Sequence, residues 1–444
     1  MKEIELAEQL LQQIVEEKKP FLAVLKQTFQ AHVELRSMRG DVAGLLGCEL
    51  RHHLLLQYLT KPFETEDPAL RRYLCLALAN NYYYKHFDAE EVKQDALSKF
   101  DESKKDEILS LFARGENPEK EIIPDEIDRD SRLYLSLRYN APEWAVKILL
   151  HYGHPLAYRC LRKFSRPLVS TVRLRTSIAG KNALDGNPDF TPSDIEGIYD
   201  YHGKQSLRKH DLFRQGKFFL EKKLIKALVD EYRVEEPSEI LLYNGNDDAS
   251  FELELIETYG KQIGMNLACP EVDAKMAVKK VIKNEELSNV NFFSATDPTF
   301  MDASISRQQD LVFAVPNSTN FDLIPETPDY LLHFDTDQMD AIIEQERQVL
   351  EGCSKYVDIN GKLIYVVFTL SKKEGKGTVA NFLKSHPEFR LLKQNDYFPF
   401  AKYDTAAYVA VMQKVEEVET APSPLVDLAP IQQQEHIFAS ASSK

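Results

Sequence analysis

The sequence predicts a multidomain α/β protein with an all-α N-terminal bundle, a basic α+β connector and a C-terminal doubly wound, Rossmann-like domain. Three observations lead to this fold class. The chain has 444 residues, more than a single core normally serves. Its first part repeats apolar residues at helical spacing. Its last part alternates short apolar runs with helical stripes, the pattern of an open, mostly parallel sheet.

Residues 1–130 should form the helical bundle. The first apolar stripe includes Leu10 and Ile14, and comparable stripes recur in the sequence that follows. The breaks between these stripes are short, as in a compact bundle. Residues 116–130 are charged and contain two prolines, so we interpret them as a linker.

Residues 131–223 should form the connector. Pro142 stands where the first turn of a helix is expected, because proline is preorganised for a helix start. The run 171–178 alternates polar and apolar residues and predicts a half-buried strand. The exposed face of that strand would display Arg173 and Arg175 together.

Residues 224–414 should form the doubly wound domain, with a helix near 338–357. The strands expected in it are 240–243, 265–269, 291–293, 310–315 and 362–368. Residues 415–444 are rich in proline, glutamine and serine, and we expect them to form a disordered tail.

Composition excludes several classes of protein. With 43% hydrophobic and 28% charged residues, the chain is not collagen-like, disordered or a disulfide scaffold. No run approaches the roughly 18–20 apolar residues of a membrane span, and the acidic start lacks a signal-peptide core. The five scattered cysteines form no CxxC pair, which indicates reduced thiols in a cytoplasmic protein. We expect no metal site, because His52 and His53 are isolated and should lie on a helix surface.

The formal net charge of −15 is unevenly distributed. Residues 131–223 carry 17 Lys and Arg against 8 Asp and Glu, whereas the segments before and after them are acidic. Nucleic acid binding depends on such cations, so only this central segment suits it. Its cations could bind phosphates, or they could form a solvated face that neutralises the acidic neighbours. Aromatic residues such as Tyr158 and Phe164 are interleaved with the cations, which favours RNA.

Several segments resemble one enzyme family in order and spacing. Residues 138–147 and 172–176 resemble the entry to the catalytic half of the RsmB (Sun/Fmu) family, and the resemblance continues through 361–374, 381–387 and 408–411. Members of that family methylate carbon 5 of a cytosine in small-subunit ribosomal RNA with S-adenosylmethionine. The helical N-terminus resembles the NusB-type RNA-binding domain that precedes their catalytic half.

The resemblance implies catalytic positions that lack the required residues here. In the family one cysteine attacks the cytosine and a second helps to release the product, because a thiolate is nucleophilic and can be expelled afterwards. The matching positions hold Phe368 and Asn317, and Ala314 replaces the aspartate that orients the base. We interpret Cys269 and Cys353 as buried apolar residues rather than relocated nucleophiles.

The cofactor positions implied by the resemblance are altered as well. The family's glycine-rich turn lets the backbone approach the methionine part of the cofactor. Here Gly245 is followed by Asp247 and Asp248, whose carboxylates would repel an anionic group. Glu271 is the acidic residue that could bind the ribose, although a solvated carboxylate at a helix start is the simpler interpretation.

These observations predict a degenerate RsmB-like protein that binds RNA through the connector, and the resemblance implies that this RNA is ribosomal. The expected RNA-binding residues are Arg159, Arg162, Lys163, Arg166, Arg173 and Arg175. We expect a monomer that binds neither DNA nor a membrane, and S-adenosylmethionine is the cofactor that the resemblance implies. Two alternatives stay open. The chain could be an active RNA cytosine-5 methyltransferase whose motifs align differently, or a protein-interaction module that uses its acidic domain and tail.

Overall fold

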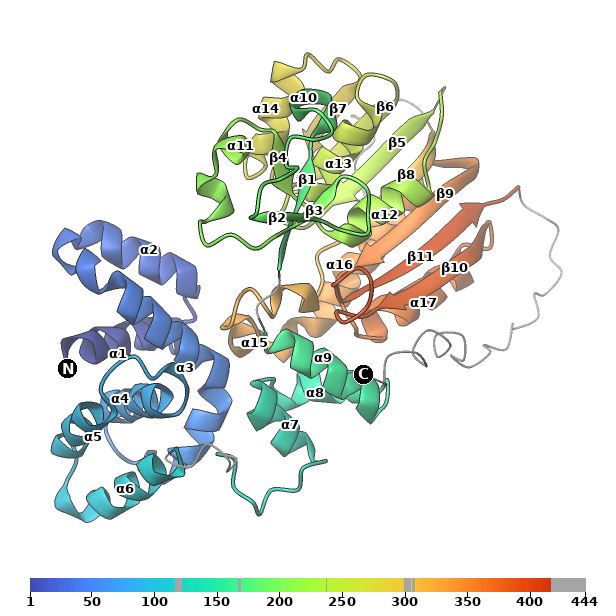
Figure 1. Ribbon diagram of the computed structural model, residues 1–444. Helices are drawn as coiled ribbons and strands as arrows, with labels where there is room; N and C mark the ends of the chain where they lie inside the picture. The colour runs from blue at the N-terminus through green and yellow to red at the C-terminus, as the bar shows by residue number, and fades with distance from the viewer. Residues whose placement is uncertain (116–121, 167–168, 237, 299–304, 306–307, 417–444) are drawn as a thin grey trace, which may run out of the picture.

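The computed structural model, shown in Figure 1, comprises a group of helices, a small sheet and a large sheet. It describes residues 1–115, 122–166, 169–236, 238–298, 305 and 308–416. The expected tail at 415–444 therefore lies almost wholly outside the described residues. Among the described residues, no helix combines the length and apolarity that are needed to cross a membrane.

The N-terminal part is helical, as the apolar stripes predict. Its α-helices are α1 (Lys2–Val15), α2 (Phe21–Ala31), α3 (Arg39–Leu59), α4 (Pro68–Ala79), α5 (Ala89–Ser98), α6 (Lys105–Arg114), α7 (Arg132–Tyr139), α8 (Glu143–Leu150) and α9 (His154–Phe164). Local sequence sets several boundaries. Asp67 caps α4 through the amide of Ala69 at 2.9 Å, and Ser131 caps α7 through the amide of Tyr134 at 3.1 Å.

The apolar core of this part continues past residue 131. One cluster of buried side chains runs from Ile4 in α1 to Phe164 at the end of α9. The helices α7, α8 and α9 therefore share a core with the N-terminal helices rather than with the small sheet. The proposed domain limits (1–130, 131–223, 224–414 and 415–444) and the NusB-like character of the first domain remain predictions.

The small sheet has the strand order β2-β3-β1-β4, and all of its neighbouring strands are antiparallel. Its elements are β1 (Ser170–Leu174), α10 (Thr176–Ala179), β2 (Phe190–Pro192), β3 (Ile198–Tyr201), α11 (Asp211–Arg214) and β4 (Phe218–Leu220). The strand expected over 171–178 thus ends at Leu174, and α10 follows it. Val172, Leu174 and Phe218 form a small core of their own.

The large sheet has seven strands in the order β10-β11-β9-β8-β5-β6-β7. Its strands are β5 (Glu239–Asn244), β6 (Gly264–Cys269), β7 (Val290–Ser294), β8 (Gln309–Val315), β9 (Val357–Val367), β10 (Phe389–Tyr397) and β11 (Ala407–Lys414). The five strands from β9 to β7 are parallel, whereas β11 is antiparallel to both of its neighbours. All five expected strands are therefore confirmed.

Helices cover both faces of the large sheet (Figure 1). They are α12 (Lys223–Glu231), α13 (Ser250–Tyr259), α14 (Met276–Asn284), α16 (Met339–Ser354) and α17 (Thr378–Ser385). One apolar layer includes Leu228 of α12 and Phe251 of α13. The opposite layer includes Val349 of α16 and Phe382 of α17. The doubly wound α/β class is confirmed.

The connection after β8 packs against the N-terminal helices. It carries α15 (Tyr330–His333), and its buried Phe321 belongs to the helical core. Asp329 accepts a hydrogen bond from the amide of Phe21 at 2.9 Å, and the His333 ring lies 2.7 Å from the carbonyl oxygen of Ile14. The carboxyl edge of the large sheet is thereby fastened to the helical part.

Candidate functional site

The site is the carboxyl edge of the large sheet, where β5 and β8 meet. The chain leaves β5 toward β6 and β7 on one side and returns to β8 on the other, so the strand order switches between β5 and β8. Doubly wound sheets bind ligands at such a switch point. Here the two strand ends approach closely: the Gly245 amide donates to the Val315 carbonyl oxygen at 2.8 Å. A Cβ atom on Gly245 would lie 2.8 Å from the Asn317 amide nitrogen, which is a steric clash, and glycine avoids this clash because it has no Cβ atom.

The turn after β5 is closed by the side chain of Asn244, which is 2% exposed. Its amide nitrogen donates to the Asp248 carbonyl oxygen at 3.1 Å and to Glu252 Oε2 at 3.0 Å. Its oxygen accepts from the Asn246 amide at 3.1 Å. Every polar group of the Asn244 side chain is thus hydrogen-bonded to the turn or to α13.

Asp248 occupies the amino end of α13. Its carboxylate accepts hydrogen bonds from the hydroxyl of Ser250 and, at 3.2 Å, from the amide of the same residue. Partial burial acts to raise the pKa of Asp248, but the Lys222 charge and the Ser250 hydrogen bonds lower that pKa to about 2. A helix amino end favours an anion, and here a carboxylate of the same chain takes that place.

A buried ion pair lies beside this turn. Lys275 immediately precedes α14, and its Nζ lies 2.6 Å from Glu252 Oε1 and 3.3 Å from the Asn244 carbonyl oxygen. Lys275 is 3% exposed and Glu252 is fully buried. Burial raises the pKa of Glu252, although Lys275 and Asn244 act in the opposite direction. This pair joins the end of β5 to the segment that follows β6.

A second cation, Lys222, lies at the same edge. Its Nζ is 2.8 Å from Asp322 Oδ2, 3.4 Å from Asp248 Oδ2 and 4.0 Å from the centre of the Phe368 ring. Partial burial acts to lower the pKa of Lys222, yet the two carboxylates raise it above its usual value. Lys222 therefore remains charged and ties the ends of β5, β8 and β9 together.

Asn317 and Phe368 follow β8 and β9, so the structure brings them to the same edge. Phe368 is 1% exposed, and its carbonyl oxygen accepts from the Phe321 amide at 2.9 Å. Asn317 is exposed, and its side-chain oxygen accepts from the Ser318 amide at 3.0 Å and from Asn320 Nδ2 at 2.7 Å. Ala314 is buried inside β8. That these three stand at the family's catalytic positions remains a prediction.

The five cysteines lie away from the ends of β8 and β9. Cys269 ends β6, which β5 separates from β8, and burial raises the pKa of its thiol to about 11. Cys353 is buried in α16. The expectation that both are buried apolar residues is confirmed. The other three thiols belong to the helical part, since Cys48 lies in α3, Cys75 in α4 and Cys160 in α9.

Glu271 is exposed just after β6. From the segment 270–275 it is Lys275, not Glu271, that reaches the end of β5. The sequence does not indicate Lys222, Lys275 and Glu252, because nothing in their spacing distinguishes them from surface lysines and a helical glutamate. A lysine close to a strand end is the one weak signal that could have suggested them.

The expectation that the strand displays Arg173 and Arg175 on an exposed face is wrong, because both side chains are buried. Arg173 Nε lies 2.9 Å from Glu254, and Arg175 contacts Glu257 at 3.0 Å and Glu285 at 2.7 Å. The cause is tertiary, because β1 faces the acidic side of α13. At these two positions the connector neutralises its acidic neighbour.

The other expected RNA-binding residues lie on α9 or follow it. Arg159 stacks over the Phe400 ring at 3.9 Å, and Lys163 pairs with Asp404 at 3.0 Å. Arg162 and Arg166 are exposed and line a hollow between α9 and the N-terminal helices. The structure thus separates the six expected residues into a buried pair, a pair engaged with the large-sheet part, and a pair that has no acidic partner among the described residues.

The histidine pair also differs from expectation. His53 is 6% exposed and lies 2.7 Å from Glu49, so it is not on the helix surface. His52 stacks on Tyr83 with ring centres 3.5 Å apart. Within the described part of the chain, no group of three or more metal-ligating side chains is present.

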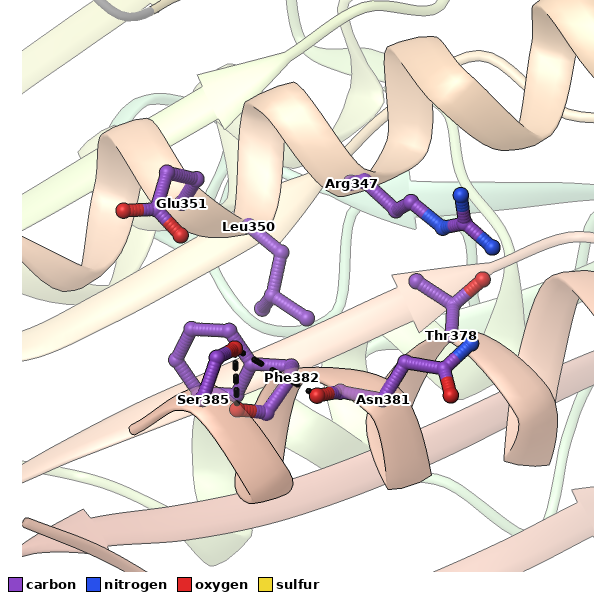
Figure 2. Close-up of a pocket in the computed structure, with 7 residues that line it drawn as sticks. All are labelled: Arg347, Leu350, Glu351, Thr378, Asn381, Phe382 and Ser385. Atoms are coloured by element: carbon purple, nitrogen blue, oxygen red, sulfur yellow. Dashed lines mark hydrogen bonds between the residues drawn. The ribbon is translucent and has the colours of Figure 1, made fainter. Parts of the chain in front are cut away.

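A separate pocket of about 350 Å³ lies between α16 and α17. Figure 2 shows Leu350 of α16 pointing toward Phe382 of α17, with Arg347 and Glu351 at the rim. Ser385 donates to the carbonyl oxygen of Phe382 at 3.0 Å. The pocket lies in the helical layer that covers the sheet.

Comparison with known proteins gives one local sequence match and several fold matches. No family model matches the chain. Ribosomal RNA small subunit methyltransferase B of Thermus thermophilus is 39% identical over 62 residues, which is 14% of this chain and 16% of that protein. The RsmB (Sun/Fmu) resemblance is confirmed. The sequence match spans about a sixth of that relative's length.

The fold matches extend over much more of the chain. The crystal structure of PH0851 has a TM-score of 0.66 at 17% identity and covers 93% of this chain and 97% of its own. NSun6 from Pyrococcus horikoshii, crystallised with SFG, has a TM-score of 0.53 at 12% identity and covers 62% of this chain and 99% of its own. At these identities the matches establish a shared fold. With PH0851 that fold includes the helical part as well as the large sheet.

Proposed function

We propose that this RsmB-like chain has lost methyl transfer and acts as an RNA-binding protein, with ribosomal RNA as its partner, as a cytoplasmic monomer. One observation carries the proposal: the ends of β8 and β9 present Asn317 and Phe368 where the resemblance expects two cysteines. Neither a carboxamide nor a phenyl ring can attack a pyrimidine. The Phe368 ring is moreover covered by Lys222, which Asp322 and Asp248 hold in place.

The carboxyl edge does not fit S-adenosylmethionine as the family's turn would bind it. Asp248 takes the amino end of α13, where the carboxylate of the cofactor would need hydrogen-bond donors. Lys222 and Lys275 form ion pairs with Asp248, Asp322 and Glu252 beside this turn, so these charged groups are engaged with one another and not with a ligand. Gly245 also lies against the backbone of Asn317, which narrows the switch point. These three features support the loss of the cofactor.

RNA binding is supported by what the connector leaves exposed. Arg162 and Arg166 carry no acidic partner among the described residues, whereas the acidic groups of the large-sheet part pair with Arg173, Arg175 and Lys163. Exposed arginines supply the phosphate contacts that dominate nucleic acid affinity. The sequence relative is a ribosomal RNA methyltransferase by name, which makes ribosomal RNA the first choice of partner.

The test uses the purified full-length chain. We expect titration calorimetry to detect no saturable binding of S-adenosylmethionine, and we expect no transfer of a radiolabelled methyl group to small-subunit ribosomal RNA. The same preparation should retain that RNA in a filter-binding assay. Methyl incorporation would establish the alternative of an active cytosine-5 methyltransferase. Failure to retain RNA would overturn the proposal in favour of a protein-interaction module.

A further inference from the structure

A second hollow, of about 640 Å³, lies in the helical part, away from the large sheet. Four arginines line it: Arg51 of α3, Arg138 of α7, Arg162 of α9 and Arg166 just after α9. We call it the four-arginine hollow. Figure 1 shows α3 beside the group formed by α7, α8 and α9, and the hollow lies at that junction. Its volume is within the range of ligand sites in proteins.

The lining of the four-arginine hollow is strongly basic. All four arginines are exposed, and no Asp or Glu is among the described residues that line it. Arg51 Nη1 donates to the Gly47 carbonyl oxygen at 3.0 Å, which leaves most of its guanidinium available. Arg51, Arg162 and Arg166 pair with no Asp or Glu among the described residues, and a phosphate would neutralise their charges. Guanidinium groups also match phosphate geometry with two parallel hydrogen bonds.

Aromatic rings form another part of the wall. Tyr83 and His52 stack with an interplanar angle of 8°. Burial, followed by the charges of Arg51 and Arg138, lowers the pKa of His52 to about 4, so this ring is neutral at pH 7 and adds no charge. Tyr139 lies on the α7 side of the hollow. Neutral rings beside arginines are the combination on which unpaired RNA bases stack while their phosphates are bound.

We infer that the four-arginine hollow is a binding site for single-stranded RNA, with a nucleotide base against the aromatic wall and flanking phosphates on the arginines. The inference rests on the proposed RNA binding and gives it a location. Folding is required to assemble the hollow, because Arg51 of α3 and Arg162 of α9 are 111 positions apart in the sequence. A purely electrostatic surface would not need the rings, and a nucleoside monophosphate would not need four separate cations.

The experiment measures the affinity of the full chain for a fluorescein-labelled single-stranded RNA oligonucleotide by anisotropy over a series of salt concentrations. In the variant R162A/R166A we expect a loss of affinity of about tenfold or more, and a salt slope smaller by about 1.4, since each phosphate contact on a single strand contributes about 0.7. The matched control R208A/K209A removes two exposed cations of the same basic segment, outside the hollow, and should leave both quantities unchanged.

A second variant tests the stacking. Tyr139→Leu keeps an apolar side chain but removes the ring, and it should weaken RNA binding by about tenfold with the salt slope unchanged. Circular dichroism of each variant checks that the helices are intact.

Equal affinities of R162A/R166A, the control variant and the wild type would overturn the inference while RNA binding itself stands. Competition by cytidine monophosphate or inorganic phosphate as effective as that by RNA would also overturn it. Absence of RNA binding by the wild type would instead overturn the proposed function.

Discussion

The buried Lys275–Glu252 pair permits a prediction with a defined magnitude. Lys275→Met removes one partner and leaves the Glu252 carboxylate in a fully buried position beside Asn244. Breaking a buried pair in this way costs about 3–5 kcal/mol of folding free energy, because the remaining charge has lost its compensation. Replacing both partners, as in E252L/K275M, should restore most of this stability, because no buried charge then remains.

The folding free energy lost in Lys275→Met should depend on pH, and the burial of Glu252 determines the direction of this dependence. Burial already raises the pKa of Glu252, and without Lys275 that pKa rises further. The folded variant then holds a proton at pH values where the unfolded chain has released it. The contribution of Glu252 to the free energy of unfolding is therefore complete below the ordinary glutamate pKa. It falls as the pH rises toward the pKa of Glu252 in the folded variant, by at most about 1.4 kcal/mol per pH unit. The deficit relative to the wild type should grow with pH.

The assay must report on the large sheet itself. The single tryptophan, Trp144, packs against the helical core, so its fluorescence would follow the wrong part of the chain. Hydrogen exchange of the β5 amides measures the local opening free energy at the end that Lys275 contacts. The control is Lys279→Met, which removes an exposed partner of Asp273 in the same segment and should change β5 exchange little. Equal β5 protection in both variants would refute the reasoning, as would E252L/K275M exchanging as fast as K275M.

Three further predictions concern the buried Arg175, the close approach at Gly245 and the thiols. Arg175→Met leaves Glu257 buried without its partner and should cost about 3 kcal/mol, measured by calorimetry; an unchanged melting temperature would contradict the buried ion pair. Gly245→Ala places a Cβ atom 2.8 Å from the Asn317 nitrogen and should cost about 1–3 kcal/mol in urea unfolding, whereas equal stability would show that the strand ends can separate. A thiol reagent should modify the native chain slowly, because four of the five cysteines are buried and burial raises the pKa of Cys48 to about 12; rapid labelling of more than one thiol would contradict this.

The burial of Arg173 and Arg175 shows what the period of a strand cannot predict. Alternation of polar and apolar residues correctly placed a strand there, since Val172 and Leu174 enter the core of the small sheet. The same alternation put the two arginines on the opposite face and suggested that this face meets water. It could not show that α13 lies there with Glu254 and Glu257. Which element covers a strand face depends on tertiary packing, not on the period of the strand.

The sequence by itself determined the helical N-terminal part and the five parallel strands of the large sheet, because the helical and strand periods of apolar residues are local properties. It also determined that Asn317 and Phe368, and no cysteine, stand at the ends of β8 and β9, because residue identity is read directly from the sequence. Only the tertiary structure decided how the charges are used. It buries Lys275 against Glu252 and places the Lys222 ammonium over the Phe368 ring. It also brings four arginines to one hollow: Arg51, Arg138, Arg162 and Arg166. Charges act through space, so their roles depend on distances that sequence spacing does not contain.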